Sequence, residues 1–123
     1  MKNIIIDLDG TLTIESDLPY AEKIPNIAVL NQLKNYKRKG FKITILTSRG
    51  MRTYDGNVGK INVYTIPVIL KWLNEHNVPF DEVFVGKAWC GFEGFYVDDK
   101  AIRPDEFLKL SYEEIRSLVG IDP

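Results

Sequence analysis

Two carboxylates stand one residue apart near the start of the sequence, directly after a short apolar run. The segment IIIDLDGT, residues 4–11, carries Asp7 and Asp9 and then turns at Gly10. An apolar run this short predicts a strand that is buried on both faces. Of two carboxylates at the end of such a strand, one can attack an electrophile and the other can move a proton. Asp7 and Asp9 are therefore the first candidates for catalysis.

Polar side chains also follow three later apolar segments. They are Thr47 and Ser48 after KITIL, Lys87 after EVFVG, and Asp98 and Asp99 after GFYV. Ligands of parallel sheets bind outside the carboxyl ends of the strands, so we expect these side chains to meet Asp7 and Asp9 at one edge of a sheet.

The chemistry of this set points to a metal ion and a phosphoryl group. Aspartates gathered at one edge repel each other unless a cation neutralises them. Oxygen ligands without Cys or His favour a hard ion, and few carboxylates with water and substrate phosphate suit Mg²⁺. Lys87 and the hydroxyl groups of Thr47 and Ser48 could hold the phosphoryl oxygens. The residues therefore predict Mg²⁺-assisted phosphoryl chemistry.

The elements that must position these residues alternate between strand and helix. Strands are predicted over 4–7, 41–46, 81–87 and 94–100, helices over 26–40, 65–77 and 111–120, a small hairpin or flap over 13–24, and a surface loop over 50–62. This alternation predicts an α/β fold with a mostly parallel sheet and helices on both faces. The length predicts a single domain, residues 1–123.

Charge and cysteine content limit the partners and the compartment. The chain has 16 basic and 17 acidic residues, with a formal net charge of -1, so no strong field favours nucleic acid or an anionic membrane. A lone cysteine, Cys90, forms no intramolecular disulfide and no thiolate zinc cage. No apolar stretch approaches the roughly 20 residues of a membrane span, and no signal peptide is evident. We expect a cytoplasmic protein.

The order of these motifs resembles that of a known family. DLDGT after an apolar strand, a strand ending at Thr47, Lys87 downstream and an acidic pair after a last strand resemble the four motifs of the haloacid dehalogenase superfamily of phosphohydrolases. The motifs span residues 4–99, which is most of the chain. The resemblance implies a Rossmann-like fold and a Mg²⁺-dependent phosphomonoester hydrolase that acts through an aspartyl-phosphate.

The resemblance also implies a role for each aspartate at the first motif. Asp7 would be the nucleophile and a Mg²⁺ ligand. Asp9 would be the general acid and base, and its backbone carbonyl would bind the metal.

The later motifs would complete the site. Thr47, with Ser48, would bind the phosphoryl oxygens, and Lys87 would stabilise the nucleophile and the phosphoryl charge. Asp98 would bind Mg²⁺ with Asp99 close behind. The family's last motif often begins with Gly-Asp and ends with a second Asp a few residues on, whereas this chain has YVDDK, which leaves the metal role of Asp99 open.

The chain has no room for the cap domain that most members of that superfamily carry. The flap at 13–24 is short, and the segment 49–87 holds one loop and one helix. We therefore expect an open site that accepts a bulky substrate or is closed by a second subunit of a homo-oligomer. The length, LTSRGMRTYDGNVGKIN and VGKAWCG resemble the small phosphatases of capsular polysaccharide biosynthesis, which implies a phosphorylated sugar, or a phosphate ester linked to one, as substrate.

Several side chains near the expected site are candidates for binding the rest of the substrate. Arg49, Arg52 and Tyr54 lie in or beside a glycine-rich loop and could hold an anionic or hydroxyl-rich group, although solvated loop residues have the same pattern. Trp89 and Phe92 could stack on a sugar ring, although packing in a core or an interface is the more common role of such aromatic residues.

Three other functions share parts of this pattern. A receiver-like phosphoacceptor domain also combines aspartates, a Thr or Ser and a Lys, but its phosphoacceptor lies on a middle strand. A phosphatase of nucleic acid ends needs a basic groove, which the balanced charge disfavours. A catalytically silent sugar-binding or assembly module would have the same fold without turnover. Asp9 favours turnover, because it supplies a proton shuttle beside Asp7.

Overall fold

Asn3–Ile6 form the first strand, β1, of a parallel sheet in the computed structural model, which describes residues 2–121. The chain divides into two units, Met1–Trp89 and Cys90–Pro123, and each is described by itself. After β1, the first unit contains the 3-10 helix η1 (Tyr20–Glu22), α1 (Ile27–Arg38), β2 (Lys42–Leu46), α2 (Val58–Tyr64), α3 (Ile66–Glu75) and β3 (Glu82–Phe84).

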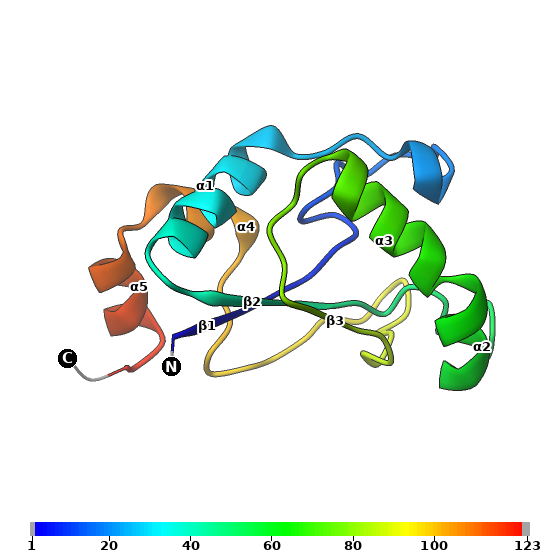
Figure 1. The fold of residues 1–123 in the computed structure, drawn as a ribbon. Coiled ribbons are helices and arrows are strands. Elements are labelled where there is room, and N and C mark those ends of the chain that lie inside the picture. The colour runs from blue at the N-terminus through cyan, green and yellow to red at the C-terminus, as the bar shows by residue number, and fades with distance from the viewer. Residues whose placement is uncertain (1, 122–123) are drawn as a thin grey trace. The chain divides into compact units, whose positions relative to one another are not determined.

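The three strands are parallel and lie in the order β1-β2-β3 (Figure 1). Ile4 is opposite Ile43, and Ile45 is opposite Val83. Parallel neighbours require a crossover between them, and α1 and α3 provide the two crossovers. The predicted α/β fold with a parallel sheet is thereby confirmed.

Helix α1 forms because start signal, apolar spacing and stop signal agree. The Asn26 side chain accepts the backbone N–H of Val29 at 3.4 Å, which caps the first turn. Leu30 and Leu33 are buried at helical spacing. Gly40 follows the helix with φ +91°, a conformation that favours glycine.

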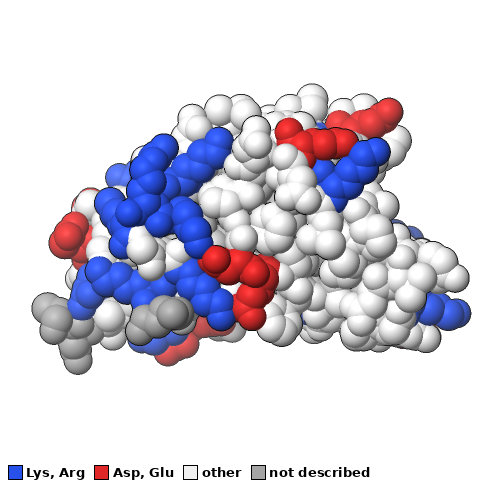
Figure 2. Space-filling view, viewed as in Figure 1, with Lys and Arg blue, Asp and Glu red and all other residues white. Residues whose placement is uncertain are grey.

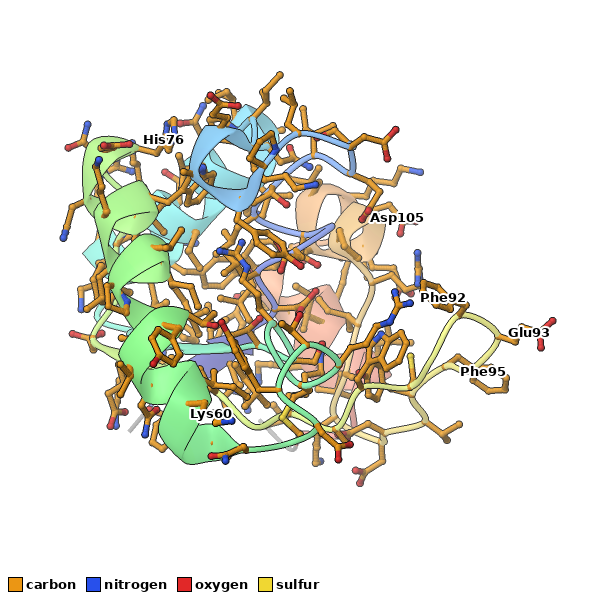
Figure 3. All side chains as sticks on the ribbon, turned by 90° about the vertical axis from the view of Figure 1, so that its right-hand side faces the viewer. Lys60, His76, Phe92, Glu93, Phe95 and Asp105 are labelled. Carbon is orange, nitrogen blue, oxygen red and sulfur yellow. The ribbon has the colours of Figure 1, made fainter. Side chains whose placement is uncertain are left out.

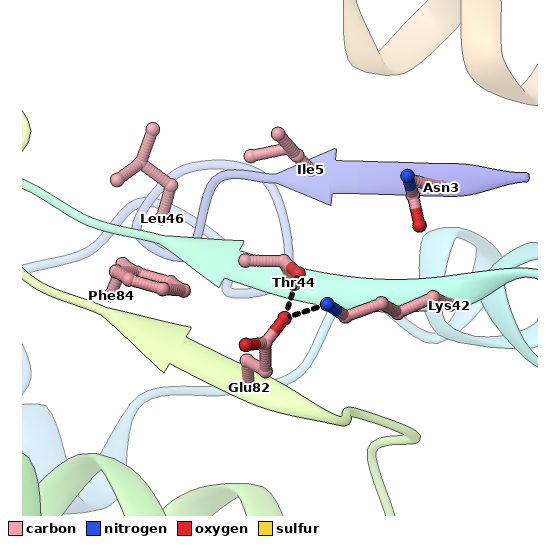
Figure 4. A pocket seen from close by; sticks show the side chains of 7 residues that line it. All are labelled: Asn3, Ile5, Lys42, Thr44, Leu46, Glu82 and Phe84. Carbon is pink, nitrogen blue, oxygen red and sulfur yellow. Dashed lines mark hydrogen bonds and ion pairs between the residues drawn. The ribbon is translucent and has the colours of Figure 1, made fainter. Parts of the chain in front are cut away.

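The sheet of the first unit has one buried face and one exposed face. Ile43 and Ile45 of β2 are fully buried, and Figure 1 shows α1 and α3 on the same side of the strands. On the other face Ile5 is 66% exposed and Phe84 52% exposed. These two side chains line a groove of roughly 310 Å³, together with a polar row in which Glu82 pairs with Lys42 (Figure 4). The helices of the first unit therefore cover one face of its sheet, not both.

The predicted loop at 50–62 is wrong in its second half, because α2 begins at Val58. The side chain of Asn57 accepts the N–H of Lys60 at 3.1 Å, and Ile61 is buried beneath the helix. Thr65 stands at the N-cap of α3 and at the C-cap of α2, with helical backbone angles and no side-chain cap bond, so it also joins the two helices. Gly59 inside this short helix, and Gly50 and Gly56 in the loop before it, made the segment look like a loop in the sequence.

The second unit contains two helices, α4 (Pro104–Lys109) and α5 (Tyr112–Leu118). The predicted capping box before α5 is confirmed, because Ser111 Oγ accepts the N–H of Glu114 at 3.2 Å and the Glu114 carboxylate accepts the N–H of Ser111 at 2.9 Å. Helix α4 was not predicted; at its start only the Glu106 carboxylate caps the chain, accepting the N–H of Arg103 at 2.9 Å, because an arginine side chain has no acceptor to return the bond.

The predicted strand over 94–100 is wrong. No residue from 90 to 121 is in a strand, and Phe95 is 81% and Val97 89% exposed. A strand needs a paired neighbour for its backbone N–H and C=O groups, and an apolar run does not supply one by itself. Phe92, Glu93 and Phe95 lie on one loop in this part of the chain (Figure 3).

Among residues 2–121, no helix has the length and apolar content needed to cross a membrane.

Candidate active site

Asp7 and Asp9 lie in a tight turn directly after β1. The carbonyl of Leu8 accepts the backbone N–H groups of Leu12 at 2.9 Å and of Thr13 at 3.1 Å. Leu8 and Leu12 are buried, so the turn is anchored in the core. Gly10 has φ +79°, where a side chain is strained, and its N–H donates to Thr13 Oγ1 at 3.1 Å. The turn thus holds both carboxylates close to the sheet edge.

Asp7 pairs with the lysine that follows the third strand. Lys87 Nζ lies 3.5 Å from Asp7 Oδ1, and the hydroxyl of Thr11 donates to Asp7 Oδ2 at 3.2 Å. Burial raises the pKa of Asp7 above its ordinary value, and the positive charge of Lys87 offsets part of this effect. The carboxylate is therefore partly desolvated and only loosely paired.

Asp9 has a different and tighter cation. Arg49 donates from Nη2 to Asp9 Oδ1 at 2.7 Å and from Nε to Asp9 Oδ2 at 3.0 Å. The Arg49 side chain is only 1% exposed. This bidentate geometry is the strong form of an arginine–carboxylate contact. Each of the two neighbouring aspartates is thus neutralised by its own basic residue.

Thr47 connects the ends of β2 and β3. Its N–H donates to the carbonyl of Phe84 at 2.9 Å, and its own carbonyl accepts the N–H of Lys87 at 3.3 Å. Thr47 Oγ1 accepts the N–H of Arg49 at 3.0 Å. Ser48 follows in a turn in which its carbonyl accepts the N–H of Met51 at 3.0 Å. Three strand ends therefore bring Asp7, Asp9, Thr47 and Lys87 into one connected set.

The candidates for substrate binding form two ring contacts in the first unit. The Arg52 guanidinium lies 5.6 Å from the centre of the Trp89 ring. Tyr54 stacks on Tyr64 at 5.8 Å between ring centres. Gly50, at the start of this loop, has φ +86° and packs so closely on α2 that an added Cβ would lie 3.0 Å from Ile61. The loop carrying Arg52 and Tyr54 is therefore fixed to the helix behind it.

Asp98 and Asp99 belong to the second unit. Asp98 Oδ1 accepts the N–H of Lys100 at 2.8 Å, and both aspartates lie exposed at a turn. Among residues 2–121 no group of three or more His, Cys, Asp or Glu side chains is arranged to hold a metal ion. The predicted metal set of Asp7, Asp9, Asp98 and Asp99 is thus divided between the two units.

The residues after β1 nevertheless fit a hard cation. Asp7 offers a carboxylate oxygen, and Asp9 offers a backbone carbonyl. Both carboxylate oxygens of Asp9 are bound to Arg49, so its side chain is less suited than its backbone to bind a metal. Mg²⁺ is commonly held by one or two carboxylates, with water and phosphate oxygens completing the shell.

One residue near this site was not identified from the sequence. The Tyr20 ring lies against Arg49, with the guanidinium carbon 4.1 Å from the ring centre. The flap that carries Tyr20 is closed by a bond from the N–H of Ile14 to the carbonyl of Ile24 at 2.8 Å. Twenty-nine positions separate Tyr20 from Arg49 (49 minus 20), and no local pattern signals a contact at such a distance in sequence.

A solved structure is similar to nearly the whole of this chain. The crystal structure of a target protein from Vibrio cholerae is 53% identical, covers 98% of both chains and has a TM-score of 0.91. A scan against protein-family models found no match, and neither did a search of curated proteins.

Part of the chain is also similar to a component of a larger assembly. One structure of a Pnkp1/Rnl/Hen1 complex matches with 26% identity and a TM-score of 0.53, covering 68% of this chain and 27% of the other. A structure of the Pnkp1/Rnl/Hen1 RNA repair complex matches with 24% identity and a TM-score of 0.52, over 68% and 25% of the two chains. This chain corresponds to about a quarter of those proteins, and the second likeness shows the fold alone.

Proposed function

This chain belongs to the same family as the Vibrio cholerae target protein, and we propose that it is a Mg²⁺-dependent phosphomonoester hydrolase of the haloacid dehalogenase type. The observation that carries the proposal is the separate pairing of Asp7 with Lys87 and of Asp9 with Arg49. Two adjacent carboxylates in different environments suit two different tasks, because environment sets which acid attacks and which moves protons.

Asp7 is the proposed nucleophile. One of its carboxylate oxygens attacks the phosphorus of the substrate, and the bond from phosphorus to the leaving oxygen breaks to give an aspartyl-phosphate. Lys87, 3.5 Å from Asp7 Oδ1, attracts both this carboxylate and the phosphoryl oxygens. Thr47 and Ser48 bind those oxygens at the end of β2. Charge neutralisation and positioning are most of what such a transfer needs.

Asp9 is the proposed proton carrier. It donates a proton to the leaving oxygen in the first step, and in the second step it takes a proton from the water that attacks the aspartyl-phosphate. The second step releases inorganic phosphate and restores the carboxylate of Asp7. Asp9 is therefore returned to its protonated state at the end of each turnover.

Mg²⁺ would supply positive charge beside the phosphoryl group. The Asp7 carboxylate and the Asp9 backbone carbonyl are its proposed ligands, and the resemblance of the sequence motifs adds Asp98 and Asp99 as further proposed ligands. The chemistry of these donors supports the assignment, since all are hard oxygen atoms.

The proposed substrate is a small phosphorylated metabolite, a sugar phosphate or a phosphate ester linked to a sugar, as in capsular polysaccharide biosynthesis. The contact of Arg52 with Trp89 and the stack of Tyr54 on Tyr64 support it, because aromatic and guanidinium faces suit sugar rings and anionic groups. A cytoplasmic location and a second subunit that closes the open site are parts of the same proposal.

A phosphatase of nucleic acid ends is the alternative that the surface charge tests, because such an enzyme needs a basic groove. Figure 2 shows basic side chains gathered over the end of α1 and the start of β2, next to acidic ones. Two of these basic residues are neutralised, since Lys37 pairs with Asp81 at 2.8 Å and Lys42 pairs with Glu82. This neutralisation favours the small substrate, because binding to RNA depends on unneutralised positive charge.

Phosphate release tests the proposal directly. We expect the native protein to release phosphate from members of a panel of sugar phosphates, nucleotides, acyl phosphates and short phosphorylated RNAs when Mg²⁺ is present, and not in chelator. Asp7→Asn should abolish release. Hydrolysis that persists in chelator, or in the Asp7→Asn protein, would contradict the mechanism. Failure to release phosphate from any substrate would leave the silent sugar-binding module and the receiver-like phosphoacceptor as the better explanations.

A further inference from the structure

Arg49 is held at both its main chain and its side chain. Its N–H donates to Thr47 Oγ1 at 3.0 Å, while Nε and Nη2 donate to the two oxygens of Asp9 at 3.0 and 2.7 Å. A guanidinium presents its donors as a rigid planar fork, so a bidentate contact sets the plane of the carboxylate as well as its distance. The orientation of Asp9 therefore depends on Arg49.

The guanidinium is in turn placed by the flap. The Tyr20 ring lies 4.1 Å from the guanidinium carbon of Arg49, in the range of a cation–π contact. The helix η1, which begins at Tyr20, lies beside α3 (Figure 1). Trp72 of α3 donates its indole N–H to the carbonyl of Lys23 at 2.8 Å, and this bond is buried. The ring that covers Arg49 is thus fixed to the body of the first unit.

The hydrogen bonds of Arg49 are not those of an ordinary buried arginine. Within residues 2–121, its Nη1 is buried and has no hydrogen-bond partner. Buried donors are rarely left unpaired in folded proteins. The side chain keeps this orientation although one nitrogen is unsatisfied, which indicates that the contacts with Asp9 and Tyr20 determine where it lies.

We propose that Arg49 and Tyr20 are positioning residues that act through Asp9 and direct its carboxylate toward the leaving oxygen of the substrate. This inference rests on the proposed function. The two contacts with Arg49 use one lone pair on each oxygen of Asp9 and leave the others for proton transfer. Loss of the bidentate contact with Arg49 would let the carboxylate of Asp9 rotate. The rate of proton transfer to the leaving group would then fall more than the rate of attack by Asp7.

The leaving group of the substrate separates this role from a merely structural one. A 4-nitrophenyl phosphate has a leaving group that departs without a proton, whereas an alkyl phosphate such as glycerol phosphate needs one. In Arg49→Met we expect kcat/KM for the alkyl phosphate, which reports the steps up to departure of the leaving group, to fall about 100-fold or more, as for loss of general acid catalysis. We expect kcat/KM for the aryl phosphate to fall only a few-fold, because the slower second step lowers kcat for both esters and does not enter kcat/KM. Asp9→Asn should show the same contrast.

Conservative variants guard against a folding defect. Arg49→Lys keeps the charge and loses the fork, and Tyr20→Ala removes the ring at the half-exposed flap; both should show the same contrast to a smaller degree. Tyr20→Phe keeps the ring and should retain the native ratio of the two kcat/KM values. Lys71→Met, on the exposed side of α3, is the matched control and should also retain it. A circular dichroism spectrum of each variant checks that it is folded.

The outcomes distinguish this inference from the proposed function. If folded Arg49→Lys and Tyr20→Ala lose activity equally on aryl and alkyl phosphates, or lose none, the positioning role is wrong, even when Asp9→Asn shows the contrast and the phosphatase proposal stands. If the native protein and Asp9→Asn release no phosphate from either ester, the proposed function is wrong, and the inference is wrong with it.

Discussion

Lys87 Nζ lies 3.5 Å from Asp7 Oδ1, although 80 positions separate the two residues in the sequence. The pairing connects the end of the first strand to the segment after the third, across the whole width of the sheet. It places a basic group beside the carboxylate whose pKa burial raises. A residue from the opposite edge of the sheet thus offsets part of the effect of burial on the pKa of the proposed nucleophile.

Replacement of Lys87 should therefore impair catalysis more than folding. In Lys87→Gln we expect kcat/KM for phosphate release to fall about 100-fold or more, as for loss of one group that stabilises charge in the transition state. The exposed Lys71 of α3 provides the matched control, Lys71→Gln, which should be indistinguishable from the native protein. Steady-state kinetics with saturating Mg²⁺ measures both. Equal activity of the two variants would remove Lys87 from the site.

The raised pKa of Asp7 predicts how stability depends on pH. Folded protein keeps the proton of Asp7 to a higher pH than the unfolded chain, whose carboxyl has an ordinary pKa of 3.8. The stability that this group contributes is therefore full below that value and is lost as pH rises through the folded-state pKa. In chelator, Asp7→Asn should melt above the native protein at pH 7, and the difference should shrink as the pH approaches 3.8. Thermal melts that differ by a constant amount across this range would contradict the assignment.

The buried hydroxyl of Thr47 should contribute to stability. Thr47 Oγ1 accepts the N–H of Arg49 at 3.0 Å, so Thr47→Val leaves a buried donor unpaired at a cost of about 1–3 kcal/mol. Thr47→Ser keeps the acceptor and should lose less. Urea denaturation gives the free energy of unfolding of each protein. If the valine variant is as stable as the serine variant, this hydrogen bond does not stabilise the fold.

Mg²⁺ should stabilise the folded protein if it binds the proposed aspartate ligands. A ligand that binds only the folded state stabilises it by about 2.7 kcal/mol at a concentration 100 times its Kd, so the melting temperature should rise as Mg²⁺ is added. Asp98→Asn and Asp99→Asn should reduce this rise if they bind the metal, whereas Asp105→Asn, a control at the exposed start of α4, should not. A full response in the first two variants would confine the metal site to Asp7 and Asp9.

Local signals in the sequence accounted for most helices and for the three paired strands. The cap at Asn26, the apolar spacing of α1 and the capping box of Ser111 and Glu114 lie within a few residues of one another, and short-range sterics and hydrogen bonds act at that range. Asp7, Thr47 and Lys87 were expected together for a related reason, since parallel strands bring their carboxyl ends to the same edge.

The secondary-structure predictions that were wrong concern segments that depend on distant partners or have weak local signals. The run FYVDD was predicted as a strand from its apolar residues, but pairing requires a neighbour that the run itself does not specify. Helix α2 was missed because Gly59 and two valines give its seven residues a low helix propensity, and the burial of Ile61 compensates for it.

The sequence by itself determined an α/β chain with carboxylates, hydroxyls and a lysine at the ends of parallel strands, because residue type and spacing decide which segments are strands and where each one ends. Only the tertiary structure decided which basic residue serves which carboxylate. Arg49 was a candidate for substrate binding. In the fold it pairs with Asp9, and its guanidinium packs against the ring of Tyr20. Forty positions separate Arg49 from Asp9 (49 minus 9), and contacts at that range exist only once the sheet and the flap have packed.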